Sequence, residues 1–121
     1  SKYSEYDLID TLLNKDARGF LKVSSYLREI DTSLSYIIFL LNQELEKIYS
    51  LIKPTTSKPY IPSFLMTKYT SASKRYTLDE LLFLLKNIAS IDIKSKYMSK
   101  KSNPWVSFNS LFHNLMSKRA E

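Results

Sequence analysis

Apolar side chains recur at intervals of three and four residues along most of this chain, which places them on one face of an α-helix. The longest stripe spans residues 34–52 and consists of Leu34, Ile37, Ile38, Leu41, Leu45, Ile48 and Ile52. Shorter stripes predict further helices over residues 4–13, 17–30, 63–71 and 76–96, and a closing helix from residue 103. The pattern therefore predicts an all-α protein, a single compact bundle of about five to six helices over residues 1–121.

Three of these stripes follow residues that favour a helix start. Asp16 is suited to accept hydrogen bonds from the first free amides of its helix. Thr77 and Glu80 have the spacing of a capping box, in which each side chain bonds to the backbone amide of the other. Asn103 comes directly before Pro104, and proline at the first helical position gives up an amide that would have no partner. These signals place the starts of three helices.

The longest helix is expected at the centre of the bundle, because Phe39 and Leu40 add a second apolar side to its stripe. Its polar residues Glu44, Glu46 and Lys47 are expected on the outer surface. A proline-rich loop over residues 53–62 then divides the chain into two halves. In the short helix that follows, we expect these side chains to point inward: Phe64, Leu65 and Tyr69.

The two C-terminal helices carry more apolar residues than one core-facing stripe needs. In the helix over 76–96, a face of Leu78, Leu81, Leu82, Leu85, Ile88 and Ala89 is widened by Phe83, Leu84 and Ile91. The closing helix has a face of Trp105, Phe108, Leu111, Phe112 and Leu115. This surplus suggests contact with a partner protein. The candidate interface residues are Phe83, Leu84, Trp105, Phe108 and Phe112.

Composition argues against most enzymatic and metal sites. Gly19 is the only glycine, whereas phosphate-binding loops need several. There is no cysteine and one histidine, His113, so thiolate zinc sites and nucleophile–histidine pairs lack their residues. We predict no catalytic residue, no cofactor and no metal, and we interpret His113 as a structural or surface histidine.

The chain carries no sign of a membrane segment or a signal peptide. Its longest apolar run, residues 37–41, is far too short to span a bilayer. The absence of cysteine favours an intracellular, cytoplasmic location. Because the chain starts at Ser1 without a methionine, we expect it to be a fragment of a larger protein.

Charge is distributed unevenly. Residues 1–52 hold six basic and eight acidic side chains, whereas residues 53–121 hold twelve basic and four acidic ones. The basic half could face nucleic acid, with phosphates bound by lysine and arginine and bases stacked on nearby tyrosines. The candidates for this surface are Lys53, Lys58, Lys68, Lys74 and Arg75. The alternative is that an AT-rich genome favours lysine codons.

Two further features allow more than one reading. Asp92 and Lys96 are four residues apart in the favoured acid-first order. They form either a surface pair or a partly buried bridge that ties this helix to the next. Trp105, the only tryptophan, lies in a first helical turn. It either packs in the core or anchors an interface, where tryptophan is enriched.

The order of motifs in the C-terminal half resembles a known family. The segments KRYTLDELLFLLKNIASIDIKSK and NPWVSFNSLFHNL combine a capping box, a leucine-rich helix, the Asp92–Lys96 pair and an aromatic closing helix. This resembles the C-terminal domain of the delta subunit of bacterial DNA polymerase III, a clamp-loader protein. The resemblance is most specific over residues 74–115 and extends over nearly the whole chain.

The resemblance implies a non-catalytic collar domain that helps to assemble the clamp loader, which places the sliding clamp on DNA during replication. Its partners would be the collar domains of other loader subunits. The sliding clamp would be reached only through an N-terminal AAA+-like domain that this chain does not contain, and DNA contact would occur in the assembled complex. The rival hypothesis is a free-standing basic helical domain that binds nucleic acid.

Overall fold

The computed structural model describes residues 2–54, 58–97 and 103–118, and every regular element in this part of the chain is a helix. The all-α prediction is confirmed, with six α-helices and one 3-10 turn among the described residues. They are α1 (Glu5–Leu13), α2 (Ala17–Glu29), α3 (Leu34–Ile52), η1 (Ser63–Leu65), α4 (Met66–Ser73), α5 (Leu78–Tyr97) and α6 (Pro104–Met116).

The predicted helix starts are confirmed. The Asp16 side chain accepts a hydrogen bond from the Gly19 amide at 3.0 Å, at the start of α2. The Thr77 amide donates to Glu80 Oε1 at 2.8 Å, and the Glu80 amide donates to Thr77 Oγ1 at 3.1 Å. Asn103 accepts from the Trp105 amide at 3.1 Å. Local hydrogen bonds of this kind satisfy amides that have no partner within the helix.

Gly19 is explained by the cap of its own helix. A Cβ atom at this position would lie 2.2 Å from Asp16 Oδ2 and 3.1 Å from the Thr11 methyl of α1. Glycine therefore leaves room for the Asp16 carboxylate and for the end of α1 at the same point.

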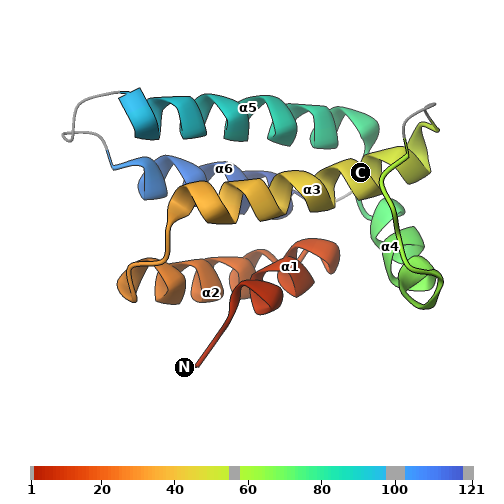
Figure 1. Cartoon of the computed structure of the whole chain (residues 1–121), viewed down its shortest axis with the longest axis horizontal. Helices are drawn as coiled ribbons and strands as arrows, with labels where there is room; N and C mark the ends of the chain where they lie inside the picture. Colours follow the sequence, from red (N-terminus) through yellow and green to blue (C-terminus); the bar gives the residue numbers. More distant parts are fainter. Residues whose placement is uncertain (1, 55–57, 98–102, 119–121) are drawn as a thin grey trace.

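The helices lie in layers, with α4 at one end (Figure 1). In this view α5 runs along one side of the molecule and α1 and α2 along the opposite side, with α3 and α6 between them. Helix α3 contacts α5, α4 and α1, while α6 contacts α2 and α5. The central position predicted for α3 is therefore confirmed.

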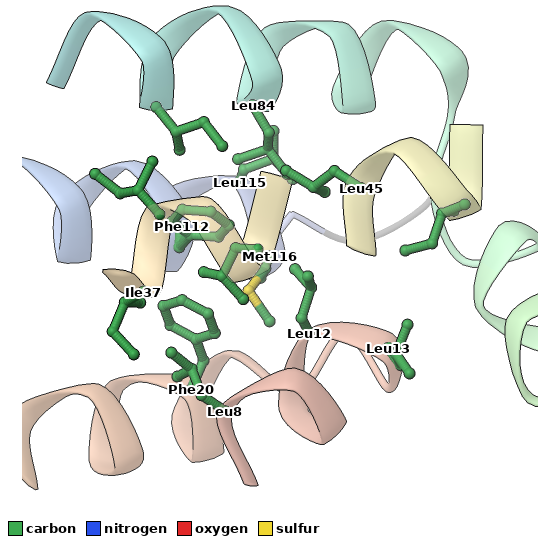
Figure 2. Close-up of a cluster of buried hydrophobic side chains, with 14 of the residues drawn as sticks. Leu8, Leu12, Leu13, Phe20, Ile37, Leu45, Leu84, Phe112, Leu115 and Met116 are labelled. Atoms are coloured by element: carbon green, nitrogen blue, oxygen red, sulfur yellow. The ribbon is translucent and has the colours of Figure 1, made fainter. Parts of the chain in front are cut away.

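Aromatic rings join α6 to α2 in the middle of the core (Figure 2). Phe112 stacks on Phe20 with ring centroids 4.7 Å apart, and it lies 4.9 Å from Phe108. Trp105 meets the edge of Phe108 at 5.6 Å. On the α5 side, Leu84 is completely buried. Helix α6 therefore links α2 to α5, as α3 links α1 to α5.

The buried face of α5 differs from the predicted one. Leu81, Leu84 and Ile88 are fully buried, whereas Leu82 and Ala89 are exposed. Five consecutive apolar residues at the start of this helix cover more than one face, so their spacing alone does not select the buried side. The core takes the face that α3 and α6 contact.

In the segment before α5, one predicted core residue is at the surface. Phe64 is 83% exposed and lies in the turn η1, which contains no buried residue. Leu65 is half-buried against the core, and Tyr69 is buried as predicted.

Candidate interaction surface

Helix α5 has a second apolar stripe that its own core does not use. Leu82, Phe83, Ile93 and Tyr97 are 45%, 52%, 59% and 81% exposed. At 3.6 residues per turn these four positions fall within an arc of roughly 100°. The polar residues Asp79, Lys86 and Ser90 are exposed within the same arc. We call the four apolar residues together with Lys86 the outer face of α5.

Three of the five predicted interface residues belong to the core. Leu84, Phe108 and Phe112 are all 0% exposed, so their assignment to an interface was wrong. The surplus of apolar residues is used to connect α6 with both α2 and α5. Phe83 is exposed, and Trp105 is half-buried beside Phe108.

A groove between α5 and α6 adjoins the outer face of α5. Phe83 lines it together with Asp79, Glu80, Leu115 and Lys118. Two of its lining residues are apolar and three are charged.

The Asp92–Lys96 pair is formed, but it ties α5 to α3 instead of to the next helix. Lys96 Nζ lies 3.0 Å from Asp92 Oδ2, with the lysine side chain half exposed. The other carboxylate oxygen, Oδ1, accepts a hydrogen bond from Ser35 Oγ of α3 at 2.8 Å. Both members line a groove between α3 and α5 that also contains the exposed Phe39.

Glu80 has a second role that sequence spacing did not reveal. Besides closing the capping box, its carboxylate lies 3.0 Å from Nζ of Lys15, a residue between α1 and α2. Lys15 also donates to the Arg75 carbonyl at 3.0 Å and lies 4.9 Å from the Tyr76 ring centroid. Arg75 in turn donates to the Leu13 carbonyl at 3.1 Å. This cluster fixes the start of α5 against the α1–α2 turn.

The free energy of unfolding should depend on pH through the Glu80 carboxylate. Burial raises the pKa of Glu80, but hydrogen bonds from Thr77 and the nearby Lys15 lower it and prevail. A carboxyl whose pKa is lower in the folded state stabilises the fold above its unfolded pKa, and this contribution is lost as pH falls through the folded pKa.

We therefore expect Glu80→Gln to destabilise the protein by about 1–2 kcal/mol near neutral pH, because hydrogen bonds to a charged group are lost. The deficit should shrink as the pH falls through the folded pKa of Glu80, where the wild-type carboxyl is protonated as well. Urea unfolding at a series of pH values measures both effects. A deficit that stays constant down to the acid limit would contradict the assignment, and the exposed Asp79→Asn is the matched control.

The predicted nucleic-acid residues divide into two groups. Lys68 pairs with Asp10 of α1 at 2.6 Å, and Arg75 bonds to the Leu13 carbonyl, so both make tertiary contacts. Lys53, Lys58 and Lys74 are exposed and form no ion pair among the residues that the structure describes.

Glu44 is buried, which corrects its predicted place on the outer surface. Its carboxylate accepts hydrogen bonds from the Tyr69 hydroxyl at 2.7 and 2.9 Å and pairs with Lys47 at 2.9 Å. Helix α4 covers this side of α3. Burial and the Glu44 carboxylate raise the pKa of the Tyr69 hydroxyl. The register contained a signal, because position 44 lies three residues after Leu41 and four before Ile48, within the apolar stripe.

Within the described ranges, no group of three or more His, Asp or Glu side chains is arranged to hold a metal ion. None of the helices described here combines the length and apolar character needed to cross a lipid bilayer. No match to this chain was found among protein-family models, curated proteins or solved structures.

Proposed function

We propose that this chain is a non-catalytic interaction domain that binds a partner protein through the outer face of α5. The observation that carries the proposal is the second apolar stripe of α5, opposite the buried one. A helix with two apolar faces needs two apolar partners. The chain's own core supplies one of them, and a second protein would supply the other.

The chemistry of the outer face favours a protein partner. Phe83 and Tyr97 are large aromatic side chains, which are enriched in interface cores and bury much area with few rotatable bonds. Lys86 lies between them and can remain hydrated at the rim while its aliphatic stem packs. Burial of the Leu82 or Ile93 side chain against a partner is worth about 1.5–3 kcal/mol when complete.

The resemblance to the delta subunit suggests which partner this is. On that reading, the chain is the collar domain of a replicative clamp loader, and α5 contacts the collar domains of other loader subunits. The motifs that carry the resemblance, from the capping box at Thr77 to the aromatic closing helix, bracket the exposed stripe. The sliding clamp would be contacted by another domain of the same subunit, within the cytoplasm of a bacterial cell.

Co-purification with the remaining loader subunits tests this function. Phe83→Asp together with Ile93→Asp should reduce the association by at least about 30-fold, since buried interface aromatics are worth 2 kcal/mol or more. The matched control is Phe39→Asp, an equally exposed aromatic on α3. Circular dichroism checks that each variant is folded.

Two results would overturn the proposal. One is no association of the wild-type chain with any loader subunit. The other is an association that the α5 double variant leaves unchanged. If Phe39→Asp reduces the association as much as the double variant does, the interface would lie at the groove between α3 and α5 that Phe39 lines.

A further inference from the structure

Two aromatic rings between α3 and α4 project into solvent from a segment that also packs on the core. Tyr60 is 81% exposed and Phe64 is 83% exposed. The residue that follows each of them, Ile61 and Leu65, is half-buried against the core. The segment is therefore anchored by Ile61 and Leu65, whereas the two rings are turned away from the protein.

Proline limits the freedom of this segment. Pro59 and Pro62 flank the Tyr60–Ile61 pair, and each fixes its own φ angle. A ligand that binds the Tyr60 ring would therefore meet a surface that is largely ordered beforehand, which reduces the entropy cost of binding.

The sequence on either side of the rings is basic. Residues 53–76 contain five basic and no acidic side chains. Lys53 and Lys58 are exposed in the same segment as Tyr60. Two acids on the helices packed beside α4 are engaged, because Asp10 pairs with Lys68 and Glu44 is buried. Glu46 of α3 is exposed and accepts a hydrogen bond from Asn42.

We propose that Tyr60, Phe64, Lys53 and Lys58 bind single-stranded nucleic acid. Exposed rings can stack on unpaired bases, and exposed lysines of the same stretch of chain can neutralise the phosphates of the same strand. A duplex would offer only the phosphates, because its bases are stacked on one another. This surface is separate from the outer face of α5, so the inference does not depend on the proposed protein partner.

The test uses the full 121-residue chain and a fluorescently labelled oligothymidylate of about 16 nucleotides, the upper site size of a small binding domain. Fluorescence anisotropy should show binding that is weaker for a duplex of equal length. Tyr60→Ala and Phe64→Ala should each weaken it by roughly 5- to 150-fold, the range for one stacked base. Tyr60→Phe keeps the ring and should restore most of the affinity.

The lysines are tested by salt dependence. Lys53→Gln with Lys58→Gln should reduce the slope of log affinity against log salt by about 1.4, or about 0.7 for each lost phosphate contact. Phe39→Ala and Lys22→Gln are matched controls, an exposed ring on α3 and an exposed lysine on α2, and both should bind as the wild type does.

Three outcomes overturn the proposal. The first is that the wild type shows no detectable binding to the oligothymidylate. The second is that the matched controls lose as much affinity as the ring and lysine variants. The third is that duplex binds as tightly as the oligothymidylate and that the ring variants do not change this affinity. If the ring variants instead lose association with loader subunits and the wild type binds no oligonucleotide, this surface serves a protein and the proposal fails. Variants of the outer face of α5 should bind the oligonucleotide normally, so the two proposals fail separately.

Discussion

Replacing Phe112 by alanine should destabilise the protein by about 3–5 kcal/mol, the usual cost of emptying a buried aromatic site. The Phe112 side chain is fully buried, stacks on Phe20 at 4.7 Å and lies 4.9 Å from Phe108. These contacts join α6 to α2, and neighbouring helices can fill the resulting cavity only in part. Since small domains have a total stability of about 5–15 kcal/mol, the loss is a large share of the whole. Chemical denaturation followed by circular dichroism measures it.

The matched control is Phe83→Ala, the same substitution on the outer face of α5. Its free energy of unfolding should change by no more than about 0.5 kcal/mol, because Phe83 is half exposed and removes little area from water. If Phe112→Ala leaves stability unchanged while Phe83→Ala lowers it, the two residues have been assigned to the wrong sides of the fold.

The helices could be predicted from the sequence because their causes are local. Apolar spacing and capping side chains act within a few residues, so Asp16, Thr77 and Asn103 mark starts that the structure confirms. The bundle follows from the number of amphipathic stripes, since each must bury one face against another.

The choice between two apolar faces of one helix could not be predicted. Residues 81–85 of α5 are all apolar, so periodicity allows several buried faces. The structure buries Leu81 and Leu84 and exposes Leu82 and Phe83, because α3 and α6 approach from one side only. The candidate interface changed accordingly, from residues chosen as the apolar surplus of the last two helices to residues that the fold leaves exposed.

Contacts between segments that are far apart in the sequence could not be predicted either. Lys15 and Glu80 are 65 positions apart, and no spacing rule connects them. Their pairing depends on how the α1–α2 turn meets the start of α5. Phe64 could not be placed for a similar reason, since a three-residue turn has too few positions to define a face.

The buried carboxylate of Glu44 provides a test of how such a polar contact is stabilised. Glu44→Ala should cost about 2–4 kcal/mol, since the buried Tyr69 hydroxyl loses its acceptor and Lys47 loses its counter-charge. The Lys47 side chain is one-quarter exposed and can turn toward water. The loss of its ion pair should therefore contribute less to the destabilisation than the unsatisfied Tyr69 hydroxyl. Urea denaturation measures the loss.

Removing both polar partners should cost less than the two single changes together. Glu44→Leu combined with Tyr69→Phe replaces the hydrogen-bonded pair by apolar groups of similar size, so no buried group stays unsatisfied. A double-mutant cycle over these two positions should give a coupling energy of about 1–3 kcal/mol, as for residues that share a hydrogen bond. Strict additivity would show that the carboxylate and the hydroxyl act independently. In that case Glu44 would be held beneath α4 by Lys47 alone, and Lys47→Met would then have to be as costly as Glu44→Ala.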